Sequence, residues 1–551
     1  MRAAIEFLDM DREELNQLVR RAQASLSVED YRKVKGMAEA LTYLTDLVAD
    51  QQTTIRDLRE LMFPASTEKT KAVLEKAGIQ NTPKPTDQPG TPDPGIPKPG
   101  AAKPGAPKNG ERKPKAPGHG RNGAEDYRTA LRVIVRHASL KPGDRCPGCL
   151  KGKVYEQKEP RQLVRIVGQA PLTATIHELQ RLRCNLCGEV YTADPPEGIG
   201  QDKYDESAAA MIAQLSYGTG MPFYRLEHLQ QNLGIPLPAS TQWDIVEEAA
   251  EVIKPARDEL IRQAAQGEVL HNDDTSMRVL ALRRAIAEED GERTGIFTSG
   301  VVSTAEGRKI ALFFTGRQHA GENLAEVLKR RAAELPMPIQ MSDALSRNAP
   351  KPINLLVANC LAHGRRRFVQ ITPNFPEQCR QVLETLGEVY HQDRVARERG
   401  LSRVARLHHH QQHSKPVMDD LHLWFEAQLN EHKVEPNSGL GGAISYMLRH
   451  WQALTLFLRE PGAPLDNNLV ERALKKAILH RRNSLFYRTL NGADVGDLYM
   501  SLIHTCELND VNPFDYLTEL QRHAEELAAN PADWMPWNHR TALERSLSKS
   551  L

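Results

Sequence analysis

The chain has 551 residues, more than one hydrophobic core can use, so several domains are expected. It contains 72 lysine and arginine residues against 71 aspartate and glutamate residues, a net charge of +1. Overall charge therefore indicates no nucleic-acid partner, and any basic surface has to be local. The sequence lacks a run of about eighteen apolar residues, and its first residues lack the apolar core of a signal peptide. We expect a soluble, cytoplasmic protein without a membrane span.

The first predicted element is a long helix within residues 1–77. Apolar side chains recur every seven residues in two interleaved series. The first series is Val34, Leu41, Val48, Ile55 and Met62, and the second is Met37, Leu44, Gln51 and Leu58. These heptads predict either a dimerising coiled coil or a helix that packs on its own protein, and the polar linker that follows favours the coiled coil.

That linker, residues 78–125, consists mainly of proline, glycine and lysine. Almost none of its side chains is large enough to bury, so ordering it would lose entropy without compensation, and we expect it to be disordered. It is either a passive spacer or a tether whose cationic side chains contact phosphates non-specifically.

Residues 126–200 carry two Cys-x-x-Cys pairs, which are Cys146 with Cys149 and Cys184 with Cys187. Four thiolates complete the tetrahedral ligand set of one structural Zn²⁺ and leave no open position for catalysis. Short strand-like stretches lie between the pairs, which favours a zinc ribbon in a reducing compartment over a redox dithiol or unrelated buried cysteines.

Residues 201–258 read as three short helices separated by Gly218–Gly220 and by Gly234 to Pro236. This is the size of a helix-turn-helix. The third helix carries Glu247, Glu248 and Glu251, which are unfavourable against phosphates. The segment is therefore either a DNA-contacting helix-turn-helix or a small bundle that positions its neighbours.

The fold class we expect is multi-domain α/β with a ribonuclease-H-like core, formed by residues 259–375 and 459–505. Three β-rich stretches, 268–284, 295–305 and 309–316, precede a helical pattern and a fourth strand near 339–341. Asp273 follows the first strand and Asp343 the fourth, so the two carboxylates should lie side by side. Glu471, on a later helix, is the candidate third acid.

Three carboxylates in this arrangement suit two Mg²⁺ or Mn²⁺ ions about 4 Å apart, which activate the attacking oxygen and stabilise the leaving one in phosphodiester displacement. Asp274 competes with Asp273, but neighbouring strand residues face opposite sides, and Asp273 is preferred. Alone, Glu471 would read as a surface partner of Lys475. Basic residues around these acids are the expected DNA contacts: Arg365, Arg366, Arg367, Arg472, Lys475, Lys476, Arg481, Arg482 and Arg488.

Residues 376–458 are expected to be a helical insertion, and 506–551 a C-terminal domain. The insertion contains His408, His409, His410 and His413. These are interpreted as a solvated helix face or a phosphate-contacting patch rather than a metal site. Cys360 and His363 have ligand-like spacing, and a packed strand-to-helix turn is the preferred interpretation.

Several strings resemble the insertion-sequence-66 family of transposases. LDNNLVERALKKAILHRRNSLFY is similar to the family's DNN-x-x-E-R segment, ANCLAHGRRRF to its G-C-x-A-H-x-R-R-x-F, and HNDDTSMRVL to its D-E-T motif. The resemblance spans about residues 35–540. It implies a DDE-type catalytic core with Asp273, Asp343 and Glu471 as the three acids, a zinc-binding domain and a helix-turn-helix.

The function expected from these features is that of a DDE transposase, a polynucleotidyl transferase that cleaves at insertion-sequence ends and transfers the strand to target DNA. The expected partners are terminal inverted repeats, target DNA, a second copy of the chain and possible accessory proteins of the same element, in the cytoplasm at the nucleoid. Two alternatives stay open: a catalytically inactive zinc-dependent DNA-binding regulator descended from a transposase, and a nuclease that cleaves without joining.

Overall fold

The computed structural model describes residues 134, 136–156, 170–183, 190–196, 202–288, 293–305, 307–351 and 353–550, with Arg21, Tyr31, Lys35, Thr70 and Val73. Apart from those five residues, the predicted coiled coil and linker lie outside this part of the chain. The chain divides into two compact units, one of 1–83, 194–228 and 237–551 and the other of 84–193 and 229–236. No helix within the described residues is long and apolar enough to span a bilayer.

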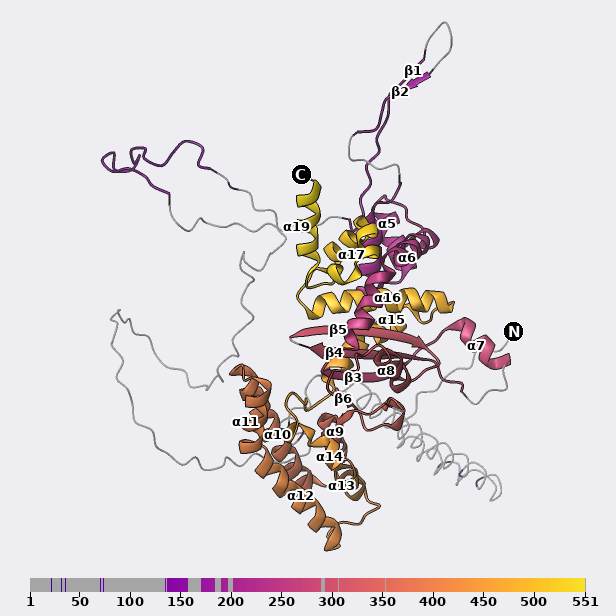
Figure 1. Cartoon of the computed structure of the whole chain (residues 1–551), viewed down its shortest axis with the longest axis vertical. Helices are drawn as coiled ribbons and strands as arrows, with labels where there is room; N and C mark the ends of the chain where they lie inside the picture. The colour runs from indigo at the N-terminus through magenta and orange to yellow at the C-terminus, as the bar shows by residue number, and fades with distance from the viewer. Residues whose placement is uncertain are drawn as a thin grey trace. The chain divides into compact units, whose positions relative to one another are not determined.

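A five-stranded mixed sheet forms the centre of the larger unit (Figure 1). Its order is β5–β4–β3–β6–β7. The strands are β3 (Val269–Ser276), β4 (Phe297–Ala305), β5 (Arg308–Gly316), β6 (Ile339–Ser342) and β7 (Leu356–Asn359). Strands β3, β4 and β5 are antiparallel neighbours, whereas β6 pairs parallel with β3 and β7 parallel with β6. This mixed sheet agrees with the α/β core predicted from the order of the β-rich stretches.

The first β-rich stretch is shorter than predicted. β3 ends at Ser276, and α7 (Leu280–Glu288) follows, where a strand through residue 284 was expected. The sequence LALRRAIAE is dominated by leucine, alanine and arginine, which have high helix propensity. The apolar residues that follow β3 therefore belong to a helix and not to a continuation of the strand.

Helices cover both faces of the sheet. On one face, α15 (Asn468–Ser484) packs against β3 and β4, and on the other α8 (Ala320–Leu328) contacts the same strands. Gly300 permits the close approach of α15, because a Cβ at that position would lie 3.0 Å from Leu474 and 3.1 Å from Val470. Ser299, one residue earlier, accepts a 2.9 Å hydrogen bond from Asn323 of α8. The two faces of β4 thus receive different helices.

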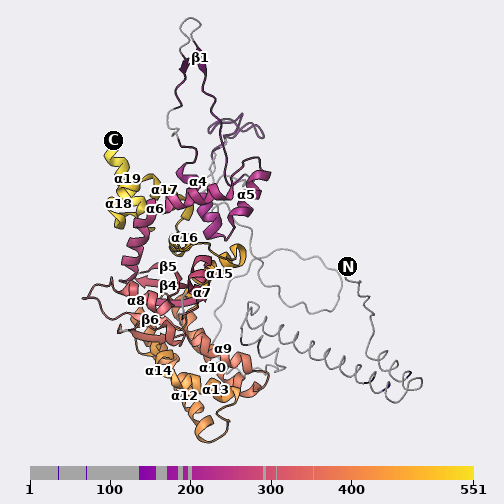
Figure 2. The same ribbon diagram turned by 90° about the vertical axis from the view of Figure 1, so that its right-hand side faces the viewer.

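The outer edge of β5 is closed by side chains of α16 (Leu490–Leu508), which lies along β5 in both views (Figure 1, Figure 2). Polar residues one helical turn apart bond to alternate residues of the strand. The pairs are Asp497 with Thr315, Ser501 with Phe313, Thr505 with Ala311, and Asn509, just past the helix, with Lys309. Four helical residues rise about 6 Å and two strand residues about 6.6 Å, so the two repeats match.

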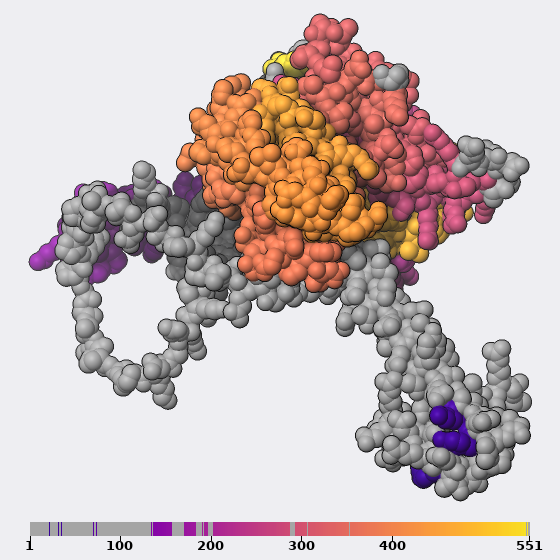
Figure 3. Space-filling model, turned by 90° about the horizontal axis from the view of Figure 1, so that it is seen from below, coloured from indigo at the N-terminus to yellow at the C-terminus, as the bar shows by residue number. Residues whose placement is uncertain are grey.

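Residues 376–458 are helical, as the sequence predicts. They contain α10 (Pro376–Glu398), α11 (Arg403–His413), α12 (Lys415–Asn430), α13 (Gly439–Arg449) and α14 (Trp451–Leu454). Figure 3 shows the outer surface of these helices in orange. Their apolar side chains and those of α9 (Leu361–Ile371) form one continuous buried cluster with β6 and β7. The segment therefore shares a core with the sheet instead of standing apart from it.

Before the sheet lie α4 (Glu206–Ala213), a π-helical turn (Gln214–Gly218), α5 (Phe223–Asn232) and α6 (Ala239–Ala264). α6 is longer than predicted and contains Pro255. It packs along α16, where the hydroxyl of Tyr499 donates to the carbonyl of Val246 at 2.9 Å. This packing is what the positioning-bundle interpretation requires, and DNA contact by these helices stays a prediction.

At the C-terminal end, α17 (Pro513–Arg522) packs against α4, and α18 (Ala524–Ala529) and α19 (His539–Ser550) follow. Two of the predicted domain boundaries, after residues 258 and 505, fall inside α6 and α16. Those boundaries are wrong, because each helix continues to bury apolar residues beyond the predicted break.

The Thr505→Val variant tests the closure of the β5 edge. Valine keeps the shape of threonine but leaves the buried N–H and C=O of Ala311 without the partners they have at 3.0 and 3.2 Å. We expect the free energy of unfolding to fall by about 1–3 kcal/mol in urea titration. Thr385→Val is the matched control, because that exposed hydroxyl bonds only to the carbonyl of Gln381 in its own helix. Equal stability of the two variants would contradict the interpretation.

Asp497 predicts a pH dependence of stability. Burial raises its pKa from 3.8 to about 7, and Arg257 and the hydrogen bonds from Thr315 only partly oppose this. Because the folded-state pKa is the higher one, this contribution to stability is full below pH 4 and is lost as pH rises through 7, by an amount on the order of 4 kcal/mol. Asp497→Asn should flatten the dependence measured by urea unfolding between pH 4 and 8; an unchanged slope would contradict it.

Candidate active site

Asp273 and Asp274 stand next to each other on β3 and face opposite sides of the sheet. In the antiparallel register Asp273 pairs with Gly300 and Asp274 with Ser299, so Asp273 shares the face of α15 and Asp274 the face of α8. Asp274 is engaged there, with His319 Nδ1 at 2.9 Å and a guanidinium nitrogen of Arg347 at 3.3 Å. The geometry thus separates the two carboxylates that the sequence left in competition.

Asp343 follows the end of β6 and lies beside Asp273. The parallel register pairs His271 with Met341, and its continuation by two residues brings the two aspartates level. The side-chain amide of Asn348 connects them. It donates to Oδ1 of Asp273 at 3.3 Å and also to Oδ1 of Asp343. Asn348 is itself fully buried, and its carbonyl accepts from Asn272 at 2.8 Å.

Glu471 lies in the first turn of α15, the helix that packs against β3, which carries Asp273. The start of the helix is fixed by Asn467, whose side-chain amide donates to the carbonyl of Asn272 at 3.1 Å. The Oδ1 of Asn467 lies 3.1 Å from Nδ1 of His271. Two buried side-chain contacts therefore hold α15 on the strand that carries Asp273.

The neighbouring acids affect the ionisation of Asp273. Its pKa is raised from 3.8 to about 7, chiefly by burial and next by the charge of Asp343, with smaller contributions from Asp274 and Glu471 and a partial offset by the backbone N–H of Asp274. Oε1 of Glu471 is buried and has no hydrogen-bond partner. Carboxylates that repel one another, one of them with an oxygen that has no donor, fit hard divalent cations such as Mg²⁺ or Mn²⁺.

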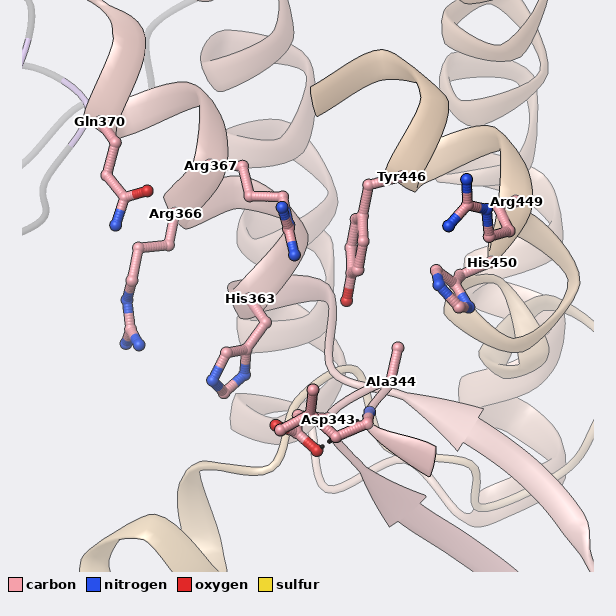
Figure 4. A pocket seen from close by; sticks show the side chains of 10 residues that line it. Asp343, Ala344, His363, Arg366, Arg367, Gln370, Tyr446, Arg449 and His450 are labelled. Atoms are coloured by element: carbon pink, nitrogen blue, oxygen red, sulfur yellow. Dashed lines mark hydrogen bonds between the residues drawn. The ribbon is translucent and has the colours of Figure 1, made fainter. Parts of the chain in front are cut away.

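A pocket of about 410 Å³ opens beside Asp343 (Figure 4). His363, Arg366 and Arg367 project into it from α9, and Tyr446, Arg449 and His450 come from α13 and its end. The Arg367 guanidinium lies 4.0 Å from the centre of the Tyr446 ring. A cationic wall next to a carboxylate site suits a phosphodiester whose reacting phosphorus lies at the acids.

The predicted DNA contacts fall into three groups. Arg365 is buried at 8% exposure and Lys476 is paired with Glu507 at 2.6 Å, so direct contact of these two with DNA is not supported. Arg481 is half-buried and donates to the Ser276 hydroxyl at 2.8 Å. The remaining predicted residues reach the surface or the pocket: Arg366, Arg367, Arg472, Lys475, Arg482 and Arg488.

The histidine-rich run of α11 is only partly the solvated face that the sequence predicts, because His408 and His413 are exposed whereas His409 and His410 are buried. His410 is 1% exposed and His409 is 8% exposed. His410 lies 2.9 Å from the Ser414 hydroxyl and 3.3 Å from Asp393, and His409 lies 2.9 Å from Gln392. His409 and His410 therefore join α11 to α10. Composition alone did not distinguish this role from that of a surface patch.

In the smaller unit, Cys146 and Cys149 form a tight turn. The Gly152 N–H donates to Cys149 Sγ at 3.4 Å, and the Cys146 N–H donates to the Gly152 carbonyl at 2.8 Å. Hydrogen bonds from Gly152 and Lys151 lower the pKa of Cys149. This turn fits one half of a zinc site, but Cys184 and Cys187, between β1 (Arg181–Arg183) and β2 (Val190–Thr192), lie outside the described residues.

Some site residues were not identified from the sequence. Asn348 lies five positions after Asp343, and its neutral amide gave no signal. Tyr446, Arg449 and His450 belong to a distant helical segment that only the fold brings to Asp343. Cys360 and His363 had a recognisable spacing, but their proximity to Glu471 could not be read from it.

Comparison with known proteins places these residues in a family. The profile of the family described as Transposase IS66 family matches residues 202–495. The chain is 28% identical over 343 residues to the uncharacterized protein y4hP of Sinorhizobium fredii, which covers 59% of this chain and 60% of that protein. It is 26% identical over 404 residues to the uncharacterized protein y4jD of the same organism, covering 69% and 75%.

The acid cluster predicts opposite stability effects for the two neighbouring aspartates. In magnesium-free buffer at pH 8, Asp273→Asn should raise the free energy of unfolding by about 1–3 kcal/mol, because it removes a buried charge repelled by Asp343. Asp274→Asn is the matched control and should lower it by a similar amount, since Asp274 has favourable partners. Thermal unfolding measures both. Destabilisation of similar size in both variants would show that the acids do not repel.

Proposed function

The chain belongs to the IS66 family of transposases, and from this we propose that it cleaves phosphodiester bonds at the ends of an insertion sequence and joins the freed 3′ ends to target DNA. The observation that supports the proposal is that Asp273 within β3, Asp343 just after β6 and Glu471 in the first turn of α15 come from elements that pack side by side. Family membership alone implies DNA transposition; the roles of individual residues are part of this proposal.

We assign the three acids to divalent cations. Asp273, in the middle, would contact two Mg²⁺ or Mn²⁺ ions, and Asp343 and Glu471 would each complete one site. Bound there, the ions activate the attacking oxygen and stabilise the charge that develops on the leaving oxygen. Asn348 fixes the orientation of Asp273 and Asp343, and Asn467 fixes the helix that carries Glu471. These amides hold the carboxylates in position before the cations arrive.

The proposed DNA path follows the exposed cations. Arg366, Arg367 and Arg449 would hold phosphates in the pocket beside Asp343. Arg472, Lys475 and Arg482 lie three, then seven, residues apart on the exposed side of α15, which carries Glu471, and would contact the backbone along that helix. A structural zinc on the four predicted cysteines and pairing of two copies through the N-terminal heptads complete the proposal.

Cleavage of labelled DNA carrying the element's terminal repeats tests the assignment. Asp273→Asn, Asp343→Asn and Glu471→Gln should each lower magnesium-dependent cleavage by about a thousandfold or more, since each loses a contact worth several kcal/mol to the transition state. DNA binding in a gel-shift assay should persist. Asp419→Asn, on the exposed surface of α12, is the control and should cleave normally.

The same assay separates the alternatives. A wild-type protein that binds the repeats but cuts nothing with Mg²⁺ or Mn²⁺ would instead be the inactive regulator. Cleavage without strand-transfer products on a supercoiled target would make it a nuclease. Either result would overturn the proposed reaction, and full activity of Asp273→Asn would overturn the assignment of the site.

A further inference from the structure

Cys360, His363 and Glu471 form a cluster that the proposed reaction does not use as a unit. Cys360 directly precedes α9 as its N-cap residue, His363 lies in the first turn of that helix, and Glu471 lies in the first turn of α15. The two helix starts are joined by a 2.9 Å hydrogen bond from the Leu361 N–H to the Leu465 carbonyl. One donor atom from each of the three clustered residues lies within 4.8 Å of the other two.

Two atoms of this cluster are buried and unpaired. Nδ1 of His363 and Oε1 of Glu471 have no hydrogen-bond partner, although they lie only 3.7 Å apart. Buried polar atoms normally have a partner, because leaving one unpaired costs about 1–3 kcal/mol. A cation between the imidazole nitrogen and the carboxylate oxygen would satisfy both atoms at once.

The third donor determines the kind of cation. A thiolate, an imidazole and a carboxylate together suit Zn²⁺ or Co²⁺, whereas Mg²⁺ prefers oxygen ligands only. The Asn467 N–H lies 3.2 Å from Cys360 Sγ, in position to donate to a sulfur ligand. We propose that Cys360, His363 and Glu471 form a binding site for a zinc-class transition-metal ion beside the pair Asp273 and Asp343.

The surroundings allow an ion to enter and to complete its coordination. His363 lines the 410 Å³ pocket, so an ion can arrive from solvent and keep water or a phosphate oxygen as its fourth ligand. Ligand atoms around one tetrahedral zinc lie roughly 3.5 Å apart, so the three donors need to close by about 1 Å. That movement is within reach of the His363 and Glu471 side chains, which are partly exposed.

The competing explanation needs no metal. A protonated His363 would form an ion pair with Glu471, and Cys360 would only pack in the strand-to-helix turn. The two explanations differ in whether sulfur takes part. Only the metal site brings Cys360 Sγ into a bond with a cation, and this produces an optical signal when the cation is Co²⁺.

The test is a Co²⁺ titration of the full-length protein, followed by the thiolate-to-cobalt charge-transfer absorption. Compared with wild type, Cys360→Ser should lose one equivalent of this absorption. Cys379→Ser, which alters another buried cysteine outside the cluster, should keep it. The four predicted zinc-ribbon cysteines are the same in all three proteins, so their contribution cancels. Identical absorption in wild type and Cys360→Ser would overturn the proposal.

His363→Gln guards against misfolding of the cysteine variant, since His363 is partly exposed and its loss should not disturb the core. It should weaken Co²⁺ binding at this site at least tenfold, and unchanged affinity would also overturn the proposal. The site shares Glu471 with the proposed Mg²⁺ site, so it rests in part on that proposal, but Co²⁺ binding is measured without DNA. Loss of DNA cleavage activity and loss of this absorption are therefore distinguishable failures.

Discussion

The structure depends on holding three mutually repelling carboxylates together with little water around them. Burial and the charges of Asp343 and Glu471 make the ionised form of Asp273 costly. Rigid elements hold the carboxylates in position despite this cost. Two neighbouring strands fix the aspartates, and Asn467 anchors the helix that carries Glu471. A carboxylate whose pKa is raised by burial and by neighbouring acids is typical of functional sites.

Strand geometry gives the adjacent residues Asp273 and Asp274 different surroundings. Because side chains alternate across β3, Asp273 faces α15 and the other acids, while Asp274 faces α8 and is paired with His319 and Arg347. The Asp273 carboxylate faces the other acids, and the Asp274 carboxylate binds side chains on the opposite face of the sheet. The same alternation on β4 places Gly300 against α15 and Ser299 against α8. Neighbouring residues of one strand therefore contact both helices.

The sequence was informative where a local pattern determines the outcome. The order of strands, the position of Asp343 after the fourth strand and the helical character of residues 376–458 follow from periodicity and spacing, whereas Asp273, expected at the end of its strand, lies inside β3, which continues to Ser276. The sequence was uninformative where the role of a residue depends on a tertiary contact. Asn348 gains its role from two carboxylates, and His409 and His410 are buried because α10 packs on them. The end of β3 was missed because apolar residues continue into α7 and hide the change of period.

The ladder between α16 and β5 has a consequence for assembly. An unpaired outer strand is a common place for two proteins to join their sheets, since it offers a row of free N–H and C=O groups. Here Asp497, Ser501, Thr505 and Asn509 already occupy that row. A second molecule therefore cannot add a strand to the sheet at the β5 edge, and any pairing of two copies would have to use other surfaces.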